Sequence, residues 1–322
     1  MMKVAYFDCF SGISGDMTLG ALLDAGLPLE VLEDGLNQLH LPEFSLSVSK
    51  VQKCGLAATS VQVNAEEGHV HRGLPEISQI IEQSGLPAAV KERSLQVFTV
   101  LAQAEARIHG STPEEVHFHE VGAVDAIVDI VGACIGLHAL EIEQVFCSAL
   151  PTGGGQVRSA HGIIPVPAPA TLALLALRNV PLYDNGQRAE LVTPTGAALM
   201  VALAEDFGVF PQLKPQMVGY GAGQKDLPVA NVLRVVIGES SVGVAASPQH
   251  SHGGVHAHVH DHAHPHSDHH HDHAHPHSDH HDHTHPHSCH GPEQAESGHT
   301  QSCPCGNGEH QAEPETRPES NY

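Results

Sequence analysis

The chain has 322 residues and a formal net charge of −23 at pH 7, with 37 acidic against 14 basic side chains. A surface this acidic repels phosphate backbones and anionic lipid headgroups, which argues against nucleic acid and membranes as partners. Asp8 interrupts the N-terminus before any signal-like apolar run, and no apolar stretch approaches the length of a membrane span, so the sequence predicts a cytoplasmic protein.

The first predicted elements are a strand, a glycine-rich loop and a helix. Residues 4–7 form a short apolar run, residues 11–15 are rich in glycine, and apolar side chains at helical spacing follow from Met17 to Leu23. The next segments predict a helix at 29–39, strands at 44–51 and 59–63, and helical structure over 75–109 with a break near Gly85.

Further along, Thr112 starts a segment with an N-cap, a first-turn proline and two acids, which predicts a short helix. The remaining segments predict a buried helix at 123–140, a strand at 142–150, a helix from Thr193 towards Glu205, and a last strand at 229–237. Two glycine-rich stretches, 151–156 and 219–223, would bring the backbone close to a ligand or to another strand. Alternating strands and helices predict an α/β fold with a mixed sheet flanked by helices.

Histidine is distributed unevenly, with 22 of the 30 residues lying from residue 250 onward. Apolar periodicity ends near residue 240, and the remaining sequence has too few large apolar side chains to offset the entropy of ordering. The sequence therefore predicts a folded domain over 1–240 and a disordered tail, rich in histidine and aspartate, over 241–322.

The tail contains a tandem repeat. The unit Asp-His-Ala-His-Pro-His-Ser-Asp-His-His starts at Asp261, recurs at Asp272 and returns in degraded form at Asp282. Imidazole suits nickel, zinc and copper(II), so the array predicts metal storage or delivery, the alternative being a solvated spacer. The predicted ligands are His262, His264, His266, His273, His275 and His277.

The opening loop offers backbone N–H groups and two acids. Ser11, Gly12, Ser14 and Gly15 are predicted to bind a phosphate-bearing ligand, with Asp8 and Asp16 as ligands of a cation beside it. No lysine follows the last glycine, so the loop is not a Walker A motif. The alternative is a tight turn capped by Asp16. Gly153 and Gly154 of the second glycine-rich stretch are also predicted to contact the ligand.

The densest cluster of candidate ligands spans residues 117–129. On an extended segment His117 and His119 point to the same side, and Asp125 and Asp129 share one helix face. Together with Glu120 they would supply two imidazoles and up to three carboxylates to one metal ion. The alternative is that the acids cap the helix or form salt bridges.

A second pair of imidazoles, His69 and His71, lies in a polar loop that would reach a cleft if it folds over the sheet; the alternative is two solvated histidines. His161, after the triple glycine, would position one more imidazole.

Taken together, these residues resemble the LarC family of nickel insertion proteins. The resemblance covers residues 2–240 and is most specific at 6–17, 117–129, 151–155, 193–196 and 219–226. It implies a CTP-dependent nickel chelatase of the lyase class that places Ni(II) into pyridinium-3,5-bisthiocarboxylic acid mononucleotide, during nickel-pincer cofactor biosynthesis. In this interpretation the loop holds the phosphate, the 117–129 cluster presents nickel, and His119 or Glu120 accepts the displaced ring proton.

The resemblance also implies a part that this chain lacks. Family members continue beyond the histidine stretch into a second domain that binds CTP with Mg²⁺ or Mn²⁺, so activity is expected to require a separately encoded C-terminal domain. The sequence allows an oligomer. Two other functions are compatible with the residues: storage or delivery of nickel without chelatase activity, and an unrelated phosphate-handling enzyme with a histidine tail.

Overall fold

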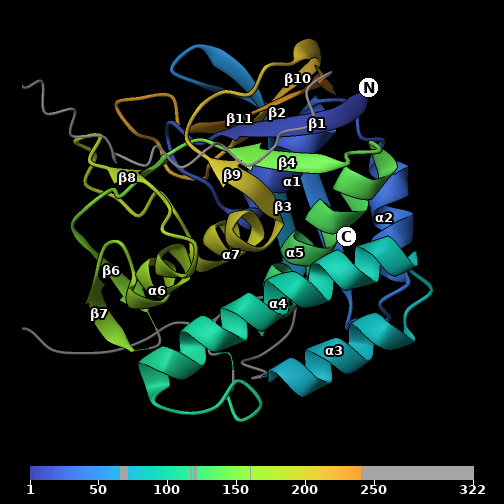
Figure 1. The fold of residues 1–322 in the computed structure, drawn as a ribbon, viewed down its shortest axis with the longest axis vertical. Helices are drawn as coiled ribbons and strands as arrows, with labels where there is room; N and C mark the ends of the chain where they lie inside the picture. The colour runs from blue at the N-terminus through green and yellow to red at the C-terminus, as the bar shows by residue number, and fades with distance from the viewer. Residues whose placement is uncertain (66–71, 117, 119–121, 160, 241–322) are drawn as a thin grey trace, which may run out of the picture. The chain divides into compact units, whose positions relative to one another are not determined.

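A computed structural model describes residues 1–65, 72–116, 118, 122–159 and 161–240. Its main sheet has the strand order β2-β3-β10-β11-β1-β4-β9 (Figure 1). These strands are β1 (Met2–Asp8), β2 (Phe44–Lys53), β3 (Leu56–Ala65), β4 (Gln144–Cys147), β9 (Ala204–Phe207), β10 (Lys214–Ala222) and β11 (Val232–Ser240). Two small sheets pair β5 (Leu150–Pro151) with β8 (Leu182–Tyr183), and β6 (Gln156–Ser159) with β7 (Gly162–Pro165).

Helices cover one face of the sheet, and Figure 1 shows α4 and α3 farther from the sheet than α1, α5 and α7. The helices are α1 (Gly15–Asp24), α2 (Leu29–Asn37), α3 (Leu74–Gln83), α4 (Ala88–His109), α5 (Val124–Ala139), α6 (Pro169–Leu177) and α7 (Pro194–Leu203). None of these helices is long and apolar enough to cross a membrane.

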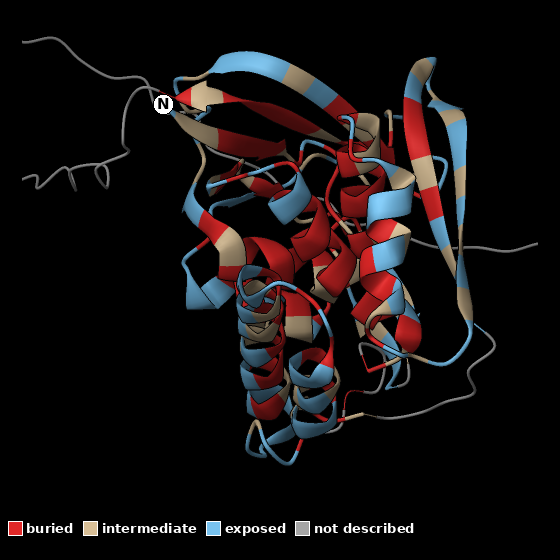
Figure 2. Ribbon diagram, turned by 90° about the vertical axis from the view of Figure 1, so that its right-hand side faces the viewer, coloured by how far each residue is buried: buried red, intermediate tan, exposed pale blue. Residues whose placement is uncertain are grey.

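The core lies between the sheet and the helices, where Figure 2 shows most of the buried residues. Strand β1 alternates between the two faces: Ala5 and Phe7 belong to the main core, whereas Val4 and Tyr6 pack on the other face with Phe146. This alternation follows from the two-residue period of a strand. The face away from the helices therefore carries only small apolar clusters.

Five strands end at the same edge of the sheet. β4 runs parallel to β1, and β9 runs parallel to β4. Both β1 and β10 run antiparallel to β11, and β10 runs parallel to β3. Strands β1, β3, β4, β9 and β10 therefore all point the same way. Ligands of open α/β sheets bind at this carboxyl edge, so the loops that follow these strands are where a site is expected.

Most predicted elements are confirmed, two predictions were wrong, and one strand has different bounds. Thr112 begins only a turn, in which its carbonyl accepts from the N–H groups of Glu115 and Val116. The strand predicted at 142–150 is divided, because β4 ends at Cys147 and β5 pairs in a separate sheet. The last strand continues beyond 237, since Gly238 to Ser240 pair with the start of β1.

Candidate metal and substrate site

The loop after β1 is largely held by bonds within the protein. Gly12 N donates to Cys9 O at 2.8 Å, Ile13 N donates to Leu191 O at 2.9 Å, and Ser11 is fully buried. Gly12 has a φ of 100°, and a Cβ there would overlap the Leu191 carbonyl. The part of the loop that lines a cavity is its end, at Ser14.

Asp8 is not brought together with the other predicted acids. Its Oδ2 is paired with Arg234, which donates from Nε at 3.1 Å and also from Nη2. By the alternation of β1, Asp8 continues the face of Val4 and Tyr6, away from the helices. The structure therefore gives this carboxylate a structural partner, and its metal role stays a prediction without geometric support.

Asp16, Asp125 and Asp129 form an acidic group where the start of α1 meets the first two turns of α5. Asp129 lies directly against Gly15, at which a Cβ would overlap the Asp129 carboxylate. Burial, and after it the negative charges of Asp16 and Asp125, raise the pKa of Asp129 well above its usual value. Its Oδ1 atom is enclosed and accepts no hydrogen bond from the residues that the structure describes. A proton or a cation would stabilise this carboxylate.

Asp16 is held by neighbours from two elements. Met17 N donates to Oδ1 at 2.9 Å, Ser14 Oγ donates to the same oxygen, and Gln224 Nε2 donates to Oδ2 at 2.9 Å. The N-cap of α1 is Ser14, whose side chain makes no capping bond, so Asp16 accepts from Met17 within the first turn without being the cap. Gln224 brings Asp16 together with the segment between β10 and β11.

Arg72 joins the two loops on which the predicted imidazoles lie. Phe118 N donates to Arg72 O at 3.1 Å, and Arg72 Nη1 donates to Gly122 O at 3.0 Å. The predicted ligands and bases on either side fall outside the described residues: His69, His71, His117, His119 and Glu120, like the tail histidines. The described residues Arg72, Phe118 and Gly122, which lie next to them in the sequence, are hydrogen-bonded to one another. Gly122 lies just before α5, which carries Asp125 and Asp129.

A cavity of about 220 Å³ opens beside Asp16, and it is called the polar cavity because most of its lining residues are polar or charged. Its lining carries both signs of charge, with Lys225 facing the same space as Asp16 and Glu190. Thr193 also lines it and caps α7, since its Oγ1 accepts from Gly196 N at 3.3 Å. Such a lining suits a ligand with an anionic group beside a bound cation.

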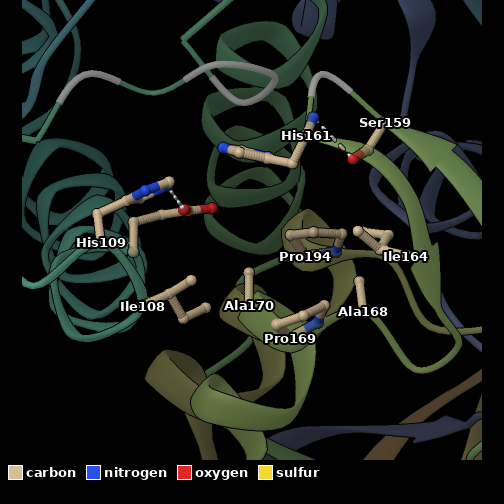
Figure 3. Close-up of a pocket in the computed structure, with 10 residues that line it drawn as sticks. Ile108, His109, Ser159, His161, Ile164, Ala168, Pro169, Ala170 and Pro194 are labelled. Atoms are coloured by element: carbon tan, nitrogen blue, oxygen red, sulfur yellow. Dashed lines mark hydrogen bonds and ion pairs between the residues drawn. The ribbon is translucent and has the colours of Figure 1, made fainter.

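A larger cavity, of about 320 Å³, lies on the other side of the first turn of α7, because Pro194 lines it and Thr193 lines the polar one. Figure 3 shows His109, at the end of α4, and His161, in the turn between β6 and β7, above an apolar floor. Sequence reasoning singled out His161 but missed His109, because helical spacing alone gives a terminal histidine no functional signal.

Gly153 and Gly154 line neither of these two cavities. Gly154 N donates to Ala189 O at 3.2 Å, and a Cβ at Gly153 would overlap the same carbonyl. Here the glycines allow two chain segments to approach closely. Across the described part of the chain, no group of three histidine, cysteine or acidic side chains is already arranged to hold a metal ion.

Comparisons with known proteins agree with this chemistry. The sequence model of the family described as "Nickel insertion protein" matches residues 5–273. The "Pyridinium-3,5-bisthiocarboxylic acid mononucleotide nickel insertion protein" of Desulfitobacterium hafniense strain DCB-2 is 56% identical over 238 residues, which is 74% of this chain and 59% of that protein. The protein of the same name from strain Y51 shows the same identity and coverage.

A relative from Synechococcus elongatus is 54% identical over 255 residues, 79% of this chain and 63% of its own length. The chain thus spans about three fifths of the length of these curated relatives. No solved structure matches it.

Proposed function

We propose, from the premise that this chain belongs to the nickel insertion protein family, that it places Ni(II) into pyridinium-3,5-bisthiocarboxylic acid mononucleotide. The relatives from Desulfitobacterium hafniense are named for this substrate. The observation that supports the proposal most is the pair of hydrogen bonds made by Arg72, which join the loops of His69, His71, His117 and His119 to the start of α5.

The ligand types fit an ion that must be passed on. Imidazole and carboxylate bind Ni²⁺ at moderate strength, and the two thiocarboxylates of the substrate offer softer sulfur donors. The family's product also contains a nickel–carbon bond. When it forms, the ring carbon loses a proton, which His119 or Glu120 accepts as general base. Asp125 and Asp129 hold the ion before transfer and offset its charge.

The polar cavity is proposed to hold the substrate's phosphate. Lys225 supplies a positive charge, and the N-terminus of α1 begins at the Ser14 side of the same cavity. Helix N-termini attract phosphate through their N–H groups and dipole. Asp16 and Glu190, which line the same cavity, would repel a lone phosphate, so nickel bound at the acidic group is expected to favour substrate binding.

CTP, with Mg²⁺ or Mn²⁺, is proposed to bind in the part of the relatives that this chain does not span. Insertion is then expected to need that C-terminal part as well. A second candidate function is storage or delivery of nickel. The histidine tail supports it, because nickel binding by the tail requires no insertion site.

The test is to mix the full chain with Ni(II), CTP, Mg²⁺ and the thiolated mononucleotide, with and without the C-terminal domain of a relative. Absorbance of the nickel-pincer product is expected only when that domain is present. Tight nickel binding without product under either condition would reject insertion in favour of the carrier function.

Variants separate the insertion site from the tail. Replacing His117 and Asp125 with alanine is expected to abolish product formation while most of the nickel stays bound, because the tail is intact. His138→Ala is the matched control: this exposed histidine lies on the same helix, on the order of 20 Å along its axis from Asp125. Full activity in the double variant would refute the site assignment.

A further inference from the structure

We infer that the larger cavity contains a second metal site, in which His109 and His161 bind one Ni²⁺ ion with the help of Glu105. The two histidines come from distant parts of the chain, the end of α4 and the turn of the β6–β7 hairpin. Their ring centroids are 4.9 Å apart, with an angle of 37° between the ring planes. Two imidazoles at this separation can reach one ion through rotation of their side chains alone.

Glu105 completes the arrangement. It lies one helical turn before His109, and its Oε2 is 3.3 Å from Nε2 of that ring. Carboxylates in this position orient metal-binding imidazoles and raise their basicity, and they offset part of the ion's charge. The Glu105 and His109 side chains are only 16% and 26% exposed, so the pair lies against protein rather than in bulk water.

The floor of the cavity strengthens the case. Ile108, Ile164, Ala170 and Pro194 give it an apolar lining, which lowers the local dielectric and strengthens interactions with an ion above it. A histidine at the end of a helix is also stabilised by the helix dipole. That explanation accounts for His109 but not for His161, which a different element places opposite it.

Two imidazoles, one of them oriented by a carboxylate, would hold nickel less tightly than a complete cage, which suits an ion in transit. The first turn of α7 separates this cavity from the polar one. The site thus lies beside the proposed insertion site, and its role there, to receive nickel from the tail, rests on the proposed function. The binding of nickel by His109 and His161 does not rest on the proposed function.

The test uses the full chain and NiSO₄ alone. Histidines are carbethoxylated with diethyl pyrocarbonate at increasing nickel concentrations, and modification of each peptide is measured by mass spectrometry. Nickel is expected to protect His109 and His161 together, at one midpoint, whereas Mg²⁺ protects neither because it prefers oxygen ligands. His40 and His138, both exposed and outside the cavity, are controls whose modification should not change.

Variants decide whether the two histidines share one ion. His161→Ala, and His161→Gln as a second variant of similar size, are expected to remove nickel protection of His109. Glu105→Gln should raise the nickel concentration for half-protection by about 10- to 100-fold. If nickel still protects His109 equally well in both His161 variants, the two histidines do not share one ion. The site is also overturned if His109 and His161 stay unprotected at nickel concentrations that protect the tail peptides. Neither readout depends on cofactor formation, so the proposed function can fail separately.

Discussion

Asp129 is a residue at which stability and chemistry oppose each other. Its carboxylate lies against Gly15 with one oxygen enclosed and unbonded, and two other aspartates are near. Burial, followed by the charges of Asp16 and Asp125, raises its pKa. Such a group destabilises the folded chain whenever it is ionised, unless a cation is bound. Selection for stability alone would replace it.

Asp129→Asn is therefore expected to stabilise the nickel-free chain at neutral pH, by about 1–3 kcal/mol. The pKa of Asp129 is higher in the folded chain than in the unfolded chain. At pH values between these two pKa values the folded state binds more protons, so the free energy of unfolding falls as pH rises through that range. The variant should lose this decline. Urea unfolding between pH 5 and 8 measures it, with Asp34→Asn on α2 as an exposed control. Equal destabilisation by Asp129→Asn at every pH would contradict the explanation.

At the level of single residues, the sequence predicted part of the candidate site. The spacing of Asp125 and Asp129 placed both on one helix, which the structure confirms. It could not predict that Asp8 would pair with Arg234, because that contact depends on the antiparallel pairing of β1 with β11. It also could not predict the approach of His109 to His161, because the end of α4 and the turn between β6 and β7 are far apart in the sequence.

Among the elements, the contact between α1 and strand β10 explains what the sequence left ambiguous. Gly219 and Gly221 lie against the backbone of α1, where a Cβ at either position would overlap carbonyl oxygens of the helix. The predicted glycine-rich segment is therefore the second half of a strand that a helix crosses closely. Strand propensity is weak in such a segment, so tertiary packing rather than local sequence determines it.

Arg72→Met tests the connection between the two histidine loops. Loss of the hydrogen bond to Gly122 O is expected to lower the free energy of unfolding by about 1 kcal/mol and to reduce nickel insertion strongly. Hydrogen exchange should accelerate at the amides of residues 122–127 and stay unchanged in α2. Arg188→Met is the matched control, because its exposed ion pair with Asp184 contributes little. Unaltered exchange at 122–127 would show that Arg72 does not hold this segment.

For the whole molecule, the predicted α/β fold with a mixed sheet is confirmed, whereas the division of the chain at residue 240 stays a prediction. Apolar periodicity ends near residue 240, and β11 ends at Ser240. The carboxyl edge of the sheet gathers five strand ends, but which loops meet there depends on strand order. Strand order is set by pairings across long sequence separations, such as β1 with β4, that local patterns do not encode.

Deletion of residues 250–322 is expected to remove most bound nickel ions and to leave insertion intact when nickel is abundant. The reason is that 22 histidines are lost while every described element remains. Equilibrium dialysis followed by metal analysis measures the stoichiometry. An unchanged number of bound ions would refute a role of the tail in nickel binding.

The pairing of β1 with β11 also constrains how the chain folds during synthesis. β1 lies inside the sheet, and its register joins Met2 to Ser240 and Asp8 to Arg234. This flank of β1 therefore stays open until almost all of the described domain has left the ribosome. Contacts this distant in sequence slow folding, and an unpaired central strand is prone to aggregate. The histidine segment is translated only afterwards, so under the proposed delivery function any nickel bound by that segment meets a domain whose last strand has already been synthesised.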